Sequence, residues 1–183
     1  MKKFFAIILA ILIFVFVHEG LHALVGIAIG EFDSFRIRPI GFEVTVRTPV
    51  DQRHGIQWAF FSGVSNLVTI LLGYLLLSFV GAFARAQVAI IRIAAYYMIL
   101  FFLLLDPLNL SIGPFLYGGD IHGIAVGLNI HPYWLQLFFL LVFLINRELA
   151  AQVLLPSYGI ETKHILLRPW LQKKFFENLT AKS

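Results

Sequence analysis

The chain contains no cysteine, and charged residues make up only 13% of its 183 residues. Without thiols it has neither disulfide bonds nor thiolate ligands, so any metal ion must be held by His, Asp or Glu. The 60% of hydrophobic residues, which include 19 Phe, exclude an ordinary soluble domain. The net charge of +4 comes from two polar stretches and not from a continuous basic patch, which indicates contact with anionic lipids and not with nucleic acid.

Long apolar runs predict an all-α polytopic membrane protein with about five transmembrane helices. The runs lie at residues 4–30, 57–81, 86–105, 112–130 and 132–149. The first run, with 27 residues, is too long for a signal peptide, although Lys2 and Lys3 precede it. Proline and glycines interrupt the fourth run, and irregular backbone at membrane depth must be buried in protein or line a cavity.

Two short segments around Gly41 predict a small membrane-associated β-hairpin after the first span. Apolar and polar residues alternate in both segments, residues 35–40 and 42–47, as they do in strands with one apolar face. The sequence shows no internal repeat, and the whole first loop is too short for a separate domain. We therefore expect the hairpin to belong to the membrane core.

The last part of the chain predicts a tail outside the membrane core. The core comprises residues 1–149, and the tail comprises residues 150–183, with an amphipathic stretch at 170–176 that is typical of the membrane interface. Five spans would place this tail on the same side as the first loop. That side would carry ten Lys and Arg residues against three, which predicts a cytoplasmic first loop and tail.

Residues 18–22 read His18-Glu19-Gly20-Leu21-His22, the HExxH pattern of zinc-dependent hydrolases, inside the first apolar run. Positions i and i+4 share a helix face, so both imidazoles can bind one metal ion while Glu19 reaches its bound water. Insertion of a helix with one acidic residue at the centre of the membrane costs about 2.5–3.5 kcal/mol of free energy, so a compensating role of these residues is expected. The alternative is a hydrogen-bonded cluster of His and Glu without metal. However, the number of HExxH matches expected by chance in a chain of this composition is only about 0.01.

A catalytic zinc site with two histidines needs a third protein ligand. Asp120 is the best candidate, because it and His22 both lie about 12 Å from the same membrane face when depth is counted along the helices. Asn66, in the second run, lies at a similar depth of about 13 Å. Asp106 fits better at the end of a span, and His122 would point elsewhere on a regular helix, but both remain alternative ligands.

Three motifs resemble those of the site-2 protease family of intramembrane zinc metalloproteases. The first is the HExxH segment at residues 18–22. The second is Ser62-Gly63-Val64-Ser65-Asn66, which is similar to the family's Gly-Pro-x-x-Asn with Val64 in place of proline. The third, at residues 109–120, is similar to the Asn-Pro region that leads to Asp-Gly-Gly, although here the acid follows the glycines. The resemblance covers about residues 15–128 and leaves no room for a PDZ or cystathionine-synthase-type domain.

The resemblance implies an endopeptidase that cleaves transmembrane proteins within or near their spans. Zn²⁺ bound by His18, His22 and Asp120 would polarise the scissile carbonyl, with Glu19 as general base and later as proton donor to the leaving amine. Asn66 would hydrogen-bond the substrate backbone or the developing oxyanion. The hairpin would capture the locally unwound substrate as an added strand. We expect a multi-pass protein of a prokaryotic cell membrane, with the active site nearer the cytoplasmic face.

Two other classes of function compete with proteolysis. A catalytically inactive family member would keep every motif and serve as a scaffold that binds membrane proteins. A transporter or proton relay would also bury His, Glu and Asp, but it does not need the HExxH spacing and more often shows related halves. The oligomeric state is left open by the sequence.

Overall fold

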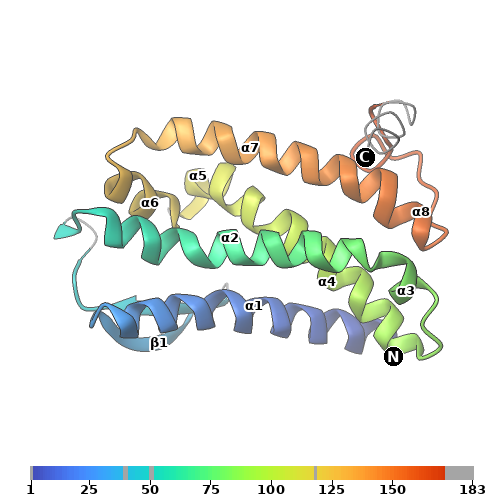
Figure 1. Cartoon of the computed structure of the whole chain (residues 1–183), viewed down its shortest axis with the longest axis horizontal. Coiled ribbons are helices and arrows are strands. Elements are labelled where there is room, and N and C mark those ends of the chain that lie inside the picture. Colours follow the sequence, from blue (N-terminus) through green and yellow to red (C-terminus); the bar gives the residue numbers. More distant parts are fainter. Residues whose placement is uncertain (1, 39–40, 50–51, 118, 172–183) are drawn as a thin grey trace.

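The computed structural model describes residues 2–38, 41–49, 52–117 and 119–171. Long helices run side by side along the long axis of the molecule, and short elements lie at the two ends (Figure 1). The long helices are α1 (Lys2–Ala28), α2 (Ile56–Ser78), α4 (Ala89–Ser111) and α7 (Pro132–Leu149). The helix of α7 continues without a break through the π-helix η2 (Ala150–Leu154) and α8 (Leu155–Ser157).

Among the described residues, four helices are long and apolar enough to cross a membrane: α1, α2, α4 and the continuous helix from Pro132 to Ser157. Many of their large apolar side chains point away from the bundle, as lipid-facing side chains do. On α1, for example, Phe4 is 70% exposed and Phe16 is 79% exposed. The structure thus confirms a mainly helical fold of membrane type. The last long helix ends at Ser157 and not at residue 149, where the apolar run was predicted to end.

The predicted span at residues 112–130 is wrong, because two short helices replace it: α5 (Pro114–Tyr117) and α6 (Ile121–Leu128). Eight residues of helix extend only about 12 Å, which is too short to cross a bilayer. Gly119 separates the two helices with a φ of +84°, a left-handed conformation that favours glycine and interrupts a regular helix. The chain therefore turns back, and α6 packs against α2 (Figure 1).

The predicted hairpin is confirmed by strands β1 (Phe32–Arg38) and β2 (Gly41–Val46), which pair antiparallel beside the end of α1. Phe35 lies opposite Val44 in the register. Gly41 opens the second strand, and residues 39 and 40, which connect the strands, lie outside the described part. The Arg47 amide donates to the carbonyl oxygen of Glu31 at 3.0 Å and closes the base of the hairpin, and the Glu31 amide donates to the carbonyl oxygen of Gly26 in α1 at 2.8 Å, which ties this base to the helix.

The described part of the tail folds back on the last long helix. The Arg147 Nε donates to the carbonyl of Leu166 at 2.6 Å, and its guanidinium lies 4.0 Å from the ring centre of Trp170. The Glu148 carboxylate accepts the backbone amides of Trp170 and Leu171, each at 3.0 Å. The adjacent Arg147 and Glu148 side chains are both buried and paired with each other, so the tail supplies the remaining partners that two buried charges require. Residues 172–176 of the predicted interfacial stretch lie outside the described part.

Four spans, in place of five, put the first loop and the tail on opposite sides. Counted along the sequence, five Lys and Arg residues of the tail then join Lys2, Lys3 and Arg85 on one side: Lys163, Arg168, Lys173, Lys174 and Lys182. The loop with the hairpin keeps Arg36, Arg38, Arg47 and Arg53 on the other. This count of eight against four no longer favours a cytoplasmic first loop, because that argument required the tail and the loop to share a side.

The four-span arrangement predicts the sidedness of three exposed positions. Cys introduced singly at Gln87 and at Glu161 should react with an impermeant thiol reagent from the same side of sealed vesicles, and Cys at Pro49 should react from the opposite side. The natural chain has no cysteine, so the unmodified protein is the blank. Labelling of Pro49→Cys and Glu161→Cys from one side would instead support five crossings.

Candidate metal centre

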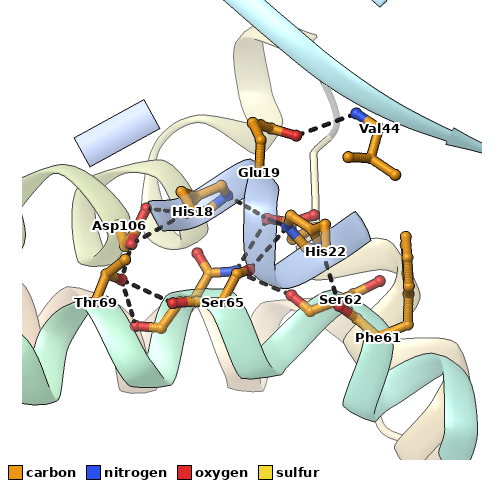
Figure 2. A network of polar contacts seen from close by, with 11 residues as sticks. His18, Glu19, His22, Val44, Phe61, Ser62, Ser65, Thr69 and Asp106 are labelled. Carbon is orange, nitrogen blue, oxygen red and sulfur yellow. Dashed lines mark hydrogen bonds and ion pairs between the residues drawn. The ribbon is translucent and has the colours of Figure 1, made fainter. Parts of the chain in front are cut away.

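His18 and His22 lie one turn apart on α1 and face the neighbouring helices α2 and α4. Their ring centroids are 4.9 Å apart, and both side chains are buried. The ring of His18 stacks on Phe14, and the ring of His22 contacts Phe61 of α2. The HExxH segment therefore presents both imidazoles to the interior of the bundle, as its spacing predicts (Figure 2).

Each histidine uses its Nδ1 for a hydrogen bond, and this fixes the role of the other nitrogen. Nδ1 of His22 lies 2.9 Å from the backbone carbonyl oxygen of Phe61, and Nδ1 of His18 lies 3.1 Å from Oδ1 of Asp106. The Phe61 carbonyl can only accept, and a carboxylate at Asp106 likewise accepts, so this arrangement puts the hydrogen on Nδ1 in each ring; in a neutral imidazole Nε2 then keeps its lone pair. The two Nε2 atoms are therefore the ones that could bind a metal ion.

Asp120 brings a carboxylate oxygen to both of these nitrogens. Its Oδ2 lies 3.3 Å from Nε2 of His22 and 3.5 Å from Nε2 of His18. Two ligand atoms that each lie about 2.1 Å from a tetrahedral metal ion are about 3.4 Å apart. Both distances are close to this value, and the ligand atoms of all three side chains lie within 4.8 Å of one another, so they could hold one ion; within the described part of the chain they are the one group of this kind.

The chemistry of this ligand set suits zinc and other divalent ions that accept nitrogen and oxygen ligands. A protein carboxylate binds a metal ion in its ionised form, and an imidazole binds it through an unprotonated nitrogen. Three protein ligands leave a fourth position of a tetrahedral site open, which is typical of catalytic sites.

Close packing of α6 on α2 determines where Asp120 lies, because Asp120 immediately precedes α6. Gly123 and Gly127 form a pair with four-residue spacing that faces Ser62 and Ala59 of α2. A side chain at either glycine would overlap those α2 residues. Such small-residue pairs let two helix backbones approach closely in a membrane.

We expect Gly127→Ala to lower both the melting temperature of the protein in detergent and its zinc content. The added methyl would overlap the backbone of Ala59 and push α6, with Asp120, away from α2. Overpacking of this kind typically costs about 1–3 kcal/mol. The matched control is Gly81→Ala, where a Cβ meets only the flexible guanidinium of Arg85 within 4 Å. Wild-type melting and zinc content in Gly127→Ala would contradict this account of how Asp120 is placed.

Glu19 lies on the neighbouring face of α1 and points toward strand β2 (Figure 2). Its Oε2 accepts the backbone amide of Val44 at 3.1 Å. It thus lies between the metal group and the hairpin.

A groove of about 660 Å³ runs beside Glu19, between α1 and the hairpin. Aromatic side chains from both elements line it, including Phe16 of α1, Phe35 of β1 and Phe42 of β2. Glu19 is the charged residue among its lining residues. An apolar chain in this groove would therefore contact the Glu19 carboxylate.

Asn66 joins the site from α2, but its amide hydrogens are already engaged. Its Nδ2 donates to Oδ2 of Asp120 and to the carbonyl oxygen of Ser62, each at 2.9 Å. Its Oδ1 is buried and has no hydrogen-bond partner within the described part of the chain. Asn66 thus holds the third ligand in place and offers a free acceptor beside it.

The two alternative ligands lie apart from the metal-binding atoms. His122 is exposed and does not belong to the metal-binding group among the described residues. Asp106 is buried within α4, where it contacts the Nδ1 of His18, so its predicted place at the end of a span is wrong. The apolar run was expected to end at residue 105, but α4 continues to Ser111 with Pro107 inside it.

Two hydroxyl side chains of α2 that were not predicted also belong to the site. Ser65 Oγ lies 2.8 Å from Nε2 of His22, and the Thr69 hydroxyl donates to Asp106. The sequence does contain a pattern that indicates them. The buried polar residues of α2 share one face of an otherwise apolar helix, at spacings of three or four residues: Ser62, Ser65, Asn66 and Thr69. Such a stripe on a membrane helix marks the face that turns toward other polar groups.

Comparisons of the chain with protein-family models, with curated proteins and with solved structures found no match. The chemistry of the site must therefore be read from its own residues. These are two imidazoles and a carboxylate at ligand spacing, a second carboxylate beside them, and an apolar groove that leads past that carboxylate. This arrangement suits metal-assisted hydrolysis of an apolar substrate.

Proposed function

We propose that the protein is an intramembrane zinc metalloprotease that hydrolyses peptide bonds within or near the transmembrane segments of other membrane proteins. The observation that carries this proposal is the convergence of His18, His22 and Asp120 at ligand spacing, next to Glu19, within a bundle of apolar helices. These three residues would hold the zinc ion. When bound, zinc supplies a Lewis acid for the scissile carbonyl and makes the attacking water more acidic.

Glu19 is the general base in this proposal. Its carboxylate takes a proton from the attacking water and afterwards delivers one to the leaving amine. One carboxylate oxygen is held by the Val44 amide at 3.1 Å, which fixes the orientation of the side chain and leaves the second oxygen for proton transfer. Asn66 orients Asp120 through Nδ2, and its Oδ1 would accept a hydrogen bond from the substrate backbone.

The groove between α1 and the hairpin is the proposed path of the substrate. A transmembrane helix satisfies its own backbone hydrogen bonds, so it must unwind locally before a peptide bond is accessible. The groove offers Phe16, Phe35 and Phe42 to apolar side chains of the unwound segment. Strand β2 pairs with β1 alone within the described part of the chain, so a substrate strand added by β-augmentation would use its other edge, where the Val44 amide now donates to Glu19.

The direct test is cleavage of a panel of single-span substrates by the purified protein, with and without a chelator, together with its metal content. We expect stoichiometric zinc, cleavage within or near the span, and loss of cleavage when the chelator removes the metal. Zinc without cleavage of any substrate would favour an inactive scaffold. Absence of bound zinc and of cleavage would overturn the proposal.

A further inference from the structure

Asp106 is a buried carboxylate that the catalytic steps above do not use. It lies inside α4 with 2% of its surface exposed, among helices that are apolar enough to cross a membrane. Its two carboxylate oxygens lie 3.1 Å and 3.3 Å from Nδ1 of His18, and the Thr69 hydroxyl of α2 donates to it. Within the described part of the chain, no Lys or Arg pairs with Asp106.

A carboxylate in this position needs a specific partner, because burial in an apolar bundle disfavours an acid at membrane depth. The partner that the structure provides is the N–H of a histidine whose other nitrogen faces Asp120. Three helices meet at this point: Thr69 comes from α2, Asp106 from α4 and His18 from α1 (Figure 2). The contact is thus a connected row of hydrogen bonds that ends at Nδ1 of His18, in the ring whose Nε2 faces Asp120.

We propose that Asp106 is a positioning residue that holds His18 in the tautomer and orientation needed to bind the metal ion, an inference that rests on the proposed metal centre. A carboxylate that accepts the Nδ1 hydrogen keeps the lone pair on Nε2, fixes the ring and makes Nε2 a stronger ligand. Thr69 in turn restrains the carboxylate from α2. Asp106 acts through His18 and is not a ligand.

The two histidines differ in this respect, which makes the inference specific. Nδ1 of His22 lies against a backbone carbonyl, that of Phe61, whereas Nδ1 of His18 lies against the side-chain carboxyl group of Asp106. A substitution can remove the partner of His18 but not that of His22. Loss of Asp106 should therefore change the state of one imidazole and leave the other as it is.

The first measurement is zinc affinity, obtained by competition with a chelator on purified full-length protein. Asp106→Asn keeps the size of the side chain but weakens its acceptor, and loss of such an outer partner typically lowers metal affinity about 10-fold to 100-fold. Thr69→Val should cause a smaller loss in the same direction. The matched control is Ser111→Ala, which removes a buried polar group of α4 that bonds only to backbone carbonyls of its own helix. This control should keep wild-type affinity.

The second measurement reports the tautomer of His18 without any metal. Nitrogen-15 chemical shifts of labelled histidine in metal-free protein should show Nδ1–H for both His18 and His22, and Asp106→Asn should change the His18 signals alone. This readout does not depend on catalysis, and a general loss of packing would not select one ring. Wild-type zinc affinity together with unchanged His18 signals in Asp106→Asn would overturn the inference. Zinc binding without proteolysis would instead contradict only the proposed function, whereas wild-type protein that binds no zinc would overturn both.

Discussion

Glu19→Gln should leave zinc bound and abolish measurable peptide hydrolysis. Gln keeps the shape of the side chain, and its amide oxygen can still accept the Val44 amide hydrogen, so the contact with β2 is retained. It cannot take a proton from water, and loss of general base assistance lowers a rate typically by about 10²-fold to 10⁴-fold. The measurement is cleavage of a single-span substrate by Glu19→Gln, compared at equal zinc content with the wild-type protein.

Glu161→Gln is the control for this experiment, because it removes the same charge from an exposed position in the tail. It should cleave at the wild-type rate. If Glu19→Gln also turns over at nearly the wild-type rate, the base must be another group and the mechanism proposed for this site is wrong. Loss of zinc from Glu19→Gln would show that the substitution disturbs the metal centre, so the rate loss could not be assigned to the base.

The parts of the fold that were predicted correctly are those in which one local pattern carries the information. The 27-residue first helix follows from an unbroken apolar run, and the hairpin follows from alternation on both sides of Gly41. His18 and His22 share a helix face because their spacing of four residues requires it. In each case neighbouring residues alone determine the structure.

The fourth run shows where local hydropathy fails. Its residues are apolar, but Gly119 in a left-handed conformation breaks the helix, and the glycine pair of α6 matches the small residues of α2. Whether such a segment crosses the bilayer or turns back depends on that tertiary contact, which hydropathy does not contain. Asp120 was nevertheless placed beside the histidines, as predicted, because α6 enters the bundle far enough to bring it there.

Asp106 shows that local sequence patterns also fail to predict part of the site. Its place before a proline indicated a helix end, since the residue before proline disfavours the helical region. In the structure α4 continues past Pro107, and Asp106 faces a histidine 88 positions earlier in the chain. No short-range pattern relates residues so distant in sequence, and only the crossing of α1 and α4 brings them together.

Asp120→Ala should remove most of the bound zinc and eliminate activity. Binding of zinc by four protein ligands is worth about 10–16 kcal/mol, or roughly 3 kcal/mol for each ligand, so loss of one corresponds to about 10²-fold or more in affinity. Asp120 is also the acceptor of the Asn66 amide and the group that faces both Nε2 atoms, so no neighbour replaces it. Zinc content after gel filtration, measured beside a chelator competition, gives the result.

His122→Ala provides the matched control for Asp120→Ala, because it removes a possible ligand two residues further along the same short segment. His122 is exposed and lies outside the metal-binding group, so zinc content and cleavage should stay at wild-type levels. Asp106→Asn should fall between the two variants, with weakened zinc binding that excess zinc restores, because it alters the orientation of a ligand and not the number of ligands. The assignment of Asp120 would be refuted if Asp120→Ala kept stoichiometric zinc while His122→Ala lost zinc or Asp106→Asn lost it completely. The third ligand would then be the residue whose substitution removes the metal.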